Sequence, residues 1–408
     1  YWRDWSSDVC SSDLNVTPTD IVNGIVPAGT TYSWNAPAVT TLSLTGGQAS
    51  GMSETSVYGS LHNEKNTVQT ATYTVRPTTL YCGTNNSFTV VVTVNPKPEI
   101  SAMSTVVCSG LSFAVSPVDL VNGIVPVNSS YRWNAPVVSN ASLTGGVGAT
   151  GQSYVNGSLT NNTNVQQTAV YTVIPTAPVP GSCEGASFTV VVYVNPKAVI
   201  SSMSTTVCSG VQFNVTPVNG TNGIVPQGTK YTWLTPSVST ASLTGGDSMS
   251  SLQDGIYGTL RNGTNTMRTA VYTVTPTTVD CGVNSSFTLT VYVNPTPEIT
   301  AMTTVVCSGY AFQVSPVNGV NGIVPGAISY AWSVPVVSNV SLTGGQSASG
   351  QAYVTGTLTN NTSVSQSATY TVRPTGTTGS CDGATFTVIV TVNPGGYINE
   401  MKIGRAHV

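Results

Sequence analysis

The sequence predicts an all-β protein built from four tandem β-sandwich domains, and three observations lead to this prediction. First, a Tyr-x-Trp motif recurs about every 99 residues along the 408-residue chain, with its Trp at Trp34, Trp133, Trp233 and Trp332. Second, apolar and polar residues alternate between Phe287 and Val293, the pattern of a strand with one buried face. Third, no segment shows the sustained 3.6-residue period of an amphipathic helix.

Three further motifs recur in the same order and support one domain per repeat. Asn-Gly-Ile-Val-Pro begins at Asn23, Asn122, Asn222 and Asn321. Leu-Thr-Gly-Gly begins at Leu44, Leu143, Leu243 and Leu342, and Val-Asn-Pro ends at Pro96, Pro196, Pro295 and Pro394. A period near 99 exceeds the roughly 20–50 residues of solenoid repeats, so each unit should bury its own core.

The repeats define the expected domain boundaries. These are 15–97 for a first repeat truncated at its N-terminus, then 98–196, 197–296 and 297–396. Residues 1–14 and 397–408 differ in composition from the rest and resemble translated sequencing-adapter sequence. We therefore expect them to be non-native and outside the fold, and the chain to be a piece of a longer protein. Repeats 1 and 3 match each other, as do 2 and 4, which indicates a duplicated two-domain block of about 199 residues.

Aromatic residues at two repeated positions are predicted to form the cores. The rings of Tyr231 and Trp233 share one strand face, as the core Trp of an immunoglobulin third strand would. In the Tyr-Thr-Val motif Tyr272 resembles a tyrosine corner, and Val274 stands where antibody domains place a cysteine. The predicted core aromatics are Trp34, Trp133, Trp233, Trp332, Tyr73, Tyr171, Tyr272 and Tyr370.

The ordered motifs resemble a known group of proteins. The series Val-Cys-Ser-Gly, Phe-x-Val-x-Pro, Tyr-x-Trp, Tyr-Thr-Val-x-Pro, Phe-Thr-Val and Val-Asn-Pro extends over about residues 15–395. It is similar to the PKD-like, immunoglobulin-like repeats of very large surface proteins in Bacteroidota. This resemblance implies an extracellular stalk, adhesin or gliding-associated protein at the cell surface, attached to the outer membrane.

The cysteines predict disulfides. The chain has eight, two in each repeat, and the two are 73–75 residues apart in repeats 2 to 4, which fits neither a zinc site nor a Cys-x-x-Cys redox motif. Disulfides indicate an oxidising, extracytoplasmic location. The predicted pairs lie within repeats: Cys108–Cys183, Cys208–Cys281 and Cys307–Cys381.

Two alternatives to this pairing remain open. In an orthodox sandwich the two cysteines of one repeat lie at opposite ends, so the bond could instead cross a domain junction. The cysteines could also be buried free thiols. The partner of Cys82 would lie upstream, so Cys82 is expected to be free or paired with Cys10.

The sequence offers little material for catalysis or metal binding. Charged residues make up 7% of the chain and the net charge is −3, which excludes electrostatic recruitment of nucleic acid or anionic lipid. His62 is the only His between residues 15 and 397, which argues against a His-based triad. Asp20 and Asp119 correspond to Asn219 and Asn318, which predicts hydrogen-bonded turns rather than a calcium site. We expect no cofactor, no metal and no insertion into a membrane.

These observations predict a non-catalytic extracellular structural or adhesive stalk. Junctions such as Val94–Pro98 contain proline and no flexible Gly/Ser tract, which predicts a rod-like array. The alternatives are an array that binds surface glycans or proteins and a non-catalytic appendage of a secreted enzyme. For glycan binding, Tyr58 and Tyr257 are the candidate stacking residues, although an ordinary position on the strand surface is the favoured interpretation. Neighbouring domains of a longer chain are the other expected partners.

Overall fold

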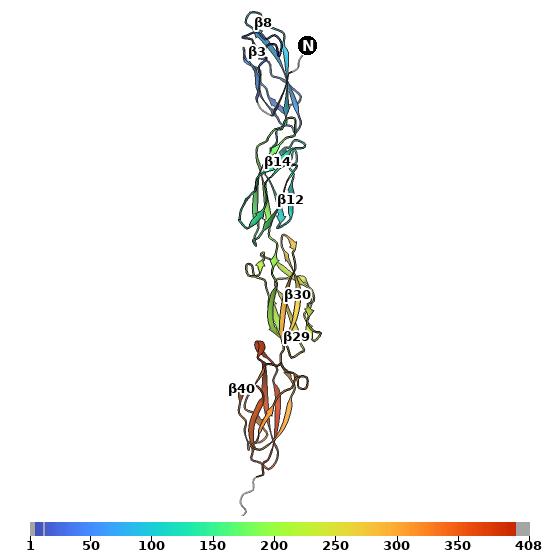
Figure 1. Ribbon diagram of the computed structural model, residues 1–408, viewed down its shortest axis with the longest axis vertical. Helices are drawn as coiled ribbons and strands as arrows, with labels where there is room; N and C mark the ends of the chain where they lie inside the picture. The colour runs from blue at the N-terminus through green and yellow to red at the C-terminus, as the bar shows by residue number, and fades with distance from the viewer. Residues whose placement is uncertain (1–4, 11–12, 397–408) are drawn as a thin grey trace, which may run out of the picture. The chain divides into compact units, whose positions relative to one another are not determined.

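The computed structural model describes residues 5–10 and 13–396, in which strands make up the regular structure apart from the short 3₁₀ helix η1, Thr378–Ser380. The chain divides into two compact units, residues 1–197 and 198–408. Each unit contains two β-sandwiches, which can be followed by colour in Figure 1. The all-β fold with four tandem sandwiches is thus confirmed. The unit boundary agrees with the two-domain block inferred from the sequence.

The first sandwich packs a larger sheet against a smaller one. The larger sheet has the order β1-β9-β7-β3, with β4 and β8 also paired to β7, and the smaller sheet has the order β2-β6-β5. β1 is parallel to β9, whereas β7 is antiparallel to its neighbours. The strands are β1 Trp5–Cys10, β2 Asp13–Val16, β3 Thr31–Trp34, β4 Ala38–Val39, β5 Leu44–Gly46, β6 Val57–Asn63, β7 Gln69–Thr79, β8 Gly83–Thr84 and β9 Phe88–Asn95.

One sequence expectation is corrected in this sandwich. Residues 1–14 were expected to lie outside the fold, but β1 and the start of β2 belong to its two sheets. β1 joins the edge of β9 through backbone hydrogen bonds. Its Val9-Cys10 repeats the Val-Cys that ends β11 in the second sandwich, a match that the unusual composition of the segment obscured. The expectation for residues 397–408 falls outside the described residues.

The second sandwich repeats this plan and adds a two-stranded sheet, β10-β13, at its entry. The larger sheet is β11-β20-β19-β14-β17 with β15 on β19, and the smaller is β12-β18-β16. The strands are β10 Glu99–Ile100, β11 Met103–Cys108, β12 Ser112–Val115, β13 Gly123–Ile124, β14 Ser130–Trp133, β15 Val137–Val138, β16 Leu143–Gly145, β17 Ala149–Gln152, β18 Val155–Asn161, β19 Gln167–Thr176 and β20 Phe188–Asn195.

The third sandwich has the same three sheets in the second unit. They are β22-β32-β30-β25-β28 with β26 and β31 on β30, then β23-β29-β27, and β21-β24. The strands are β21 Val199–Ile200, β22 Met203–Cys208, β23 Gln212–Val215, β24 Gly223–Ile224, β25 Lys230–Trp233, β26 Ser237–Val238, β27 Leu243–Gly245, β28 Met249–Gln253, β29 Ile256–Asn262, β30 Arg268–Thr278, β31 Gly282–Val283 and β32 Phe287–Asn294.

The fourth sandwich completes the second unit. Its sheets are β34-β44-β42-β37-β40 with β38 and β43 on β42, then β35-β41-β39, and β33-β36. The strands are β33 Glu298–Ile299, β34 Met302–Cys307, β35 Ala311–Val314, β36 Gly322–Ile323, β37 Ile328–Trp332, β38 Val336–Val337, β39 Leu342–Gly344, β40 Ala348–Gln351, β41 Val354–Asn360, β42 Gln366–Gly376, β43 Cys381–Asp382 and β44 Phe386–Asn393.

Each sandwich buries a core of its own, and the repeated aromatic residues lie in it. The main hydrophobic clusters are each confined to one repeat. The eight aromatic positions of the Tyr-x-Trp and Tyr-Thr-Val motifs are no more than 5% exposed: Trp34, Trp133, Trp233, Trp332, Tyr73, Tyr171, Tyr272 and Tyr370. Burial of rings this large is a major part of the stabilisation of each sandwich.

The second glycine of Leu-Thr-Gly-Gly makes room for the core tyrosine. At Gly246, where φ is +78°, an added Cβ would lie 2.7 Å from the Tyr272 hydroxyl and 2.8 Å from Pro236 Cγ. The same contact with the tyrosine, at 2.8–2.9 Å, recurs for Gly47, Gly146 and Gly345. The motif therefore reflects both a left-handed backbone and close packing.

The Asn-Gly-Ile-Val-Pro loop is held by two side-chain hydrogen bonds. In the second sandwich the Val118 amide donates to Asn122 Oδ1 at 2.8 Å and the Val125 amide donates to Asp119 Oδ1 at 2.9 Å. Asp20, Asn219 and Asn318 accept the hydrogen bond equivalent to that of Asp119. The hydrogen-bonded turns predicted from these positions are confirmed.

Candidate functional site at the domain junctions

The junction inside each unit is a buried segment rather than an open linker. In the first unit Asn95 is 3% exposed and Pro96 and Pro98 are buried, and in the second unit Asn294 is 2% exposed with Pro295 and Pro297 buried. The chain then enters the next sandwich as β10 or β33, which pairs with the Asn-Gly-Ile-Val-Pro loop of that sandwich. The prolines fix φ, which restricts the conformations open to this segment.

A disulfide closes each of these junctions. We call the loop between the last two long strands of a sandwich the F–G loop; it comprises residues 177–187 in the second sandwich and 377–385 in the fourth. Cys10, at the end of β1, is bonded to Cys183 in the first of these loops, and their Cα atoms are 5.5 Å apart. Cys208, at the end of β22, is bonded to Cys381 in the second, with a Cα distance of 5.6 Å.

The pairing within repeats was therefore wrong, and the direction of the strands explains why. Cys208 lies opposite Asn294 at the end of β32, whereas Cys281 lies before the start of that strand. A strand of eight residues extends about 25 Å, far beyond the Cα separation of about 7 Å that a disulfide allows. The first cysteine instead meets the F–G loop of the following sandwich, because that loop lies at the end where the chain enters.

The other two predicted pairs, Cys108–Cys183 and Cys307–Cys381, do not form either. Cys183 is bonded to Cys10 and Cys381 is bonded to Cys208, so neither is available to the cysteine of its own repeat. Cys108 and Cys281 are disulfide-bonded, whereas Cys82 and Cys307 are exposed free thiols. Of the two outcomes expected for Cys82, free or paired with Cys10, the structure shows the free thiol. Disulfides persist in oxidising surroundings, which indicates an extracellular location.

Glycines let the F–G loops approach the junction closely. A Cβ added to Gly181 would lie 2.6 Å from the Asn95 side chain, and one added to Gly379 would lie 2.2 Å from Asn294 Nδ2. The sequence analysis assigned none of these four residues to a site. The sequence did contain a signal for the disulfides that bring them together, because the bonded cysteines are 173 residues apart in both units, whereas the separation of the two cysteines within a repeat varies.

Ion pairs anchor the same loops to their own sandwiches. Arg132 Nη2 lies 2.8 Å from Glu184 Oε2, and Arg373 pairs with Asp382. A hydrogen bond from Thr375 (2.7 Å) and the charge of Arg373 lower the pKa of Asp382. All four charged side chains are about half exposed, so each pair contributes little to stability and serves mainly to orient the loop.

His62 lies on β6 beside the first junction. Its Nε2 is 3.9 Å from Glu99 Oε1, and both side chains are about half exposed. Among the described residues, no group of three or more His, Cys, Asp or Glu is placed to hold a metal ion.

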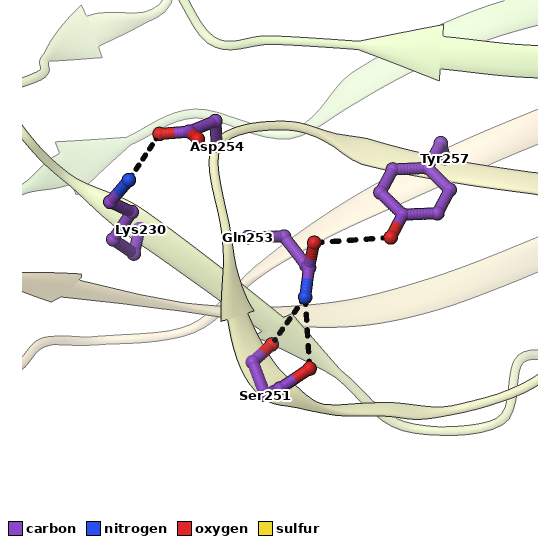
Figure 2. Close-up of polar contacts among 5 residues, drawn as sticks. All are labelled: Lys230, Ser251, Gln253, Asp254 and Tyr257. Atoms are coloured by element: carbon purple, nitrogen blue, oxygen red, sulfur yellow. Dashed lines mark hydrogen bonds and ion pairs between the residues drawn. The ribbon is translucent and has the colours of Figure 1, made fainter.

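The candidate stacking tyrosines pack against the core tryptophans. The Tyr257 ring meets Trp233 edge-on at 5.5 Å, and its hydroxyl donates to Gln253 Oε1 at 3.0 Å (Figure 2). Gln253 is held in turn by Ser251, and Lys230 pairs with Asp254 beside it. Tyr58 makes the equivalent contact with Trp34 and remains 46% exposed. Both tyrosines therefore belong to the surface of the sandwich.

Within the part of the chain that the structure describes, no helix has the length and apolar character needed to cross a membrane.

Comparison with known proteins identifies one family and several similar folds. The model of the PKD-like domain matches residues 7–98, 105–198, 205–297 and 304–396, the first match beginning inside the segment that the sequence analysis set aside. No curated protein matches the chain. Drosophila N-cadherin EC1-4 is 11% identical over 96% of this chain and 99% of that chain, with a TM-score of 0.25.

Two further solved structures are similar at the same level. Immunoglobulin domains 1–5 of Sidekick-1 are 11% identical over 96% of this chain and 79% of that chain, with a TM-score of 0.21. A Bacteroides ovatus protein, SGBP-B, solved with a mixed-linkage heptasaccharide, is 14% identical over 87% of this chain and 89% of that chain, with a TM-score of 0.15. The model of the PKD-like domain matches four successive segments that together span most of the chain, and the chain therefore belongs to the PKD-like domain family.

Proposed function

We propose that this chain is a non-catalytic extracellular array of PKD-like domains with a structural or adhesive role at the cell surface. The observation that carries the proposal is the disulfide that joins one sandwich to the next within each unit. Sandwiches with separate cores are usually connected by linkers that permit relative motion. A covalent bond across the junction is useful to a protein whose role depends on keeping its domains in series.

The occupation of the sandwich ends supports the same proposal. In β-sandwiches the loops at the two ends are the usual binding surfaces. Here the F–G loops of the second and fourth sandwiches contact the preceding junction through Gly181 and Gly379. These end loops are committed to domain–domain contact. Attachment to the outer membrane, as the family resemblance implies, is part of the proposal.

The disulfide can be tested by cutting the junction. A protease site inserted between Ser101 and Ala102, which are both exposed and outside the strands, would separate the first sandwich from the rest after cleavage. We expect the cut chain to migrate as one species on a denaturing gel without reductant and as two species with it. Cys183→Ser should give two species under both conditions. Two species from the unreduced wild-type chain would contradict the proposal.

The array itself can be tested by small-angle X-ray scattering of the full oxidised chain. Each sandwich should extend about 40 Å along the array, so we expect the scattering of an elongated particle. The profile of a compact globule, or of domains that reorient freely, would contradict a structural role.

Binding of glycans or proteins is the alternative function, and the exposed ring of Tyr58 favours it most. A glycan array probed with the full chain distinguishes the two functions. Binding that is lost in Tyr58→Ala and kept in Tyr81→Ala, another exposed tyrosine of the same sandwich, would favour the alternative.

A further inference from the structure

A groove lies at the entry end of the first sandwich, and the equivalent surface of each of the other three sandwiches is covered by a strand of the chain. It has a volume of about 690 Å³. Its walls are the Asn-Gly-Ile-Val-Pro loop, the rings of Tyr32 and Phe88, and Cys82, which lies in the F–G loop of the first sandwich between β7 and β9. Most of the lining residues are apolar, and the loop beside them is exposed at Ile25. The groove therefore suits an extended apolar segment.

The equivalent space in the other sandwiches is filled by the strand that follows the junction. In the second sandwich Ile100 of β10 belongs to one buried cluster with Val125, Tyr131 and Phe188. These three residues are the repeat equivalents of Val26, Tyr32 and Phe88 in the groove. Ile200 and Ile299 pack in the same way against the cores of the third and fourth sandwiches.

Exposure of the loop differs between the first sandwich and the other three. The proline of Asn-Gly-Ile-Val-Pro is buried at Pro126, Pro226 and Pro325 but exposed at Pro27. The preceding isoleucine is 93% exposed at Ile25, whereas its three counterparts are partly buried. Apolar side chains are thus left in solvent only where no described strand covers the loop.

The loop of the first sandwich nevertheless has the shape that accepts such a strand. Gly24 has φ +114°, close to +115° at Gly123. An added Cβ would lie 2.0 Å from the Glu99 carbonyl oxygen at Gly123, but at Gly24 it would meet no described atom within 4 Å. The hydrogen bonds that set this shape are also present, from the Val26 amide to Asp20 at 2.8 Å and from the Thr19 amide to Asn23 at 2.7 Å.

We propose that this groove is a binding site for the junction strand of another PKD-like repeat. The strand has the type Pro-x-Pro-Glu-Ile, as at Pro96–Ile100. It pairs antiparallel with Gly24 and Ile25, and its isoleucine packs on Tyr32 and Phe88, as β10 does with β13 and its core. The loop needs no rearrangement to receive it, because its backbone already has the bound shape. The inference rests on the proposed function and extends it by naming a partner of the first sandwich.

A labelled synthetic peptide with the sequence of residues 94–102 tests the site by fluorescence anisotropy. We expect saturable binding to the full chain, and equally to a form that begins at Trp5, which shows that residues 1–4 do not determine the result. The same peptide with Ile100→Asp should bind at least about tenfold more weakly, because a carboxylate would enter the apolar groove. Bound peptide should also slow alkylation of Cys82 and leave that of the exposed Cys307 unchanged.

Two glycine variants of the chain provide the matched comparison. Gly24→Ala should weaken peptide binding at least about tenfold, since its Cβ would meet the carbonyl of the incoming strand. Gly29→Ala has a positive φ of +78° and open space, and it does not line the groove, so its binding should equal that of the wild type. Absence of binding in both forms of the chain, equal binding of the Asp peptide, or equal binding to Gly24→Ala would overturn the site. Such a failure would leave the cleavage and scattering results, and therefore the proposed function, unaffected.

Discussion

A buried hydroxyl group recurs at the centre of every sandwich. The hydroxyls of Tyr73, Tyr171, Tyr272 and Tyr370 are buried and have no hydrogen-bond partner among the described residues. Desolvation raises the pKa of Tyr272 to about 12, and the charge of Asp247 adds to this effect. A buried polar group without a partner normally costs free energy, so the tyrosine ring is retained here at some expense in stability.

This hydroxyl makes the third sandwich sensitive to alkali. Between pH 10 and about 12 the unfolded tyrosine loses its proton while folded Tyr272 keeps it, so the free energy of unfolding should fall as the pH rises. In Tyr272→Phe this loss should be smaller, and at pH 7 the variant should be at least as stable as the wild type. Urea unfolding of the full chain at pH 7, 10 and 11.5 measures both effects. Tyr310→Phe, at a ring that is 69% exposed, is the control, and an equal alkaline loss in Tyr272→Phe would contradict the assignment.

The residues of the core could be predicted from the sequence alone. Tyr231 and Trp233 alternate with polar neighbours, and period two assigns them to the buried face. The orphan hydroxyl of Tyr272 could not be predicted, since it depends on Pro236 and Gly246, which are distant in sequence and close only in the fold.

At the scale of elements, the Leu-Thr-Gly-Gly turn combines two constraints that one pair of variants can separate. Gly246→Ala adds a left-handed alanine and also a Cβ against Tyr272, so it should destabilise the third sandwich by about 2–4 kcal/mol. Gly220→Ala has φ +81° but open space around it, so it should cost only about 1 kcal/mol. Thermal unfolding of the two full-length variants makes the comparison. Equal losses would show that backbone strain alone explains the motif.

The end at which a loop lies decided which cysteines could pair. Strand order and length indicated that the two cysteines of one repeat lie at opposite ends, and the constant separation of 173 residues was the only sign in the sequence of the partner in the following sandwich. The approach depends on Gly181 and Gly379, whose lack of a side chain lets the F–G loop reach the preceding junction. β1, by contrast, has a signal in the sequence, since Val9-Cys10-Ser11 repeats the Val-Cys-Ser motif of the later repeats. It was missed because residues 1–14 were set apart on their composition.

At the scale of the whole molecule, separate cores imply that the sandwiches unfold separately. Trp233 is 3% exposed and donates from Nε1 to the Asp247 carbonyl at 3.1 Å. Trp233→Ala should cost about 3–5 kcal/mol, a large share of the stability of one domain. Hydrogen exchange of the full chain should then show loss of protection in the third sandwich and normal protection in the other three. Loss in the fourth sandwich as well would show that the two cores of the second unit are coupled.

The junction disulfides also determine how the protein responds to mechanical tension. A pulling force that enters before Cys10 and leaves after Cys183 passes through the S–S bond, so the 173-residue span between them carries no load. If both sandwiches of the unit lost their structure, this span would stay looped out and the tether would not lengthen. Reduction would release it, at about 3.3–3.6 Å per residue, or about 600 Å of slack in each unit. With the disulfides oxidised, the looped spans cannot lengthen under tension. Once the disulfides are reduced, unfolding of the sandwiches adds the length of these spans to the tether.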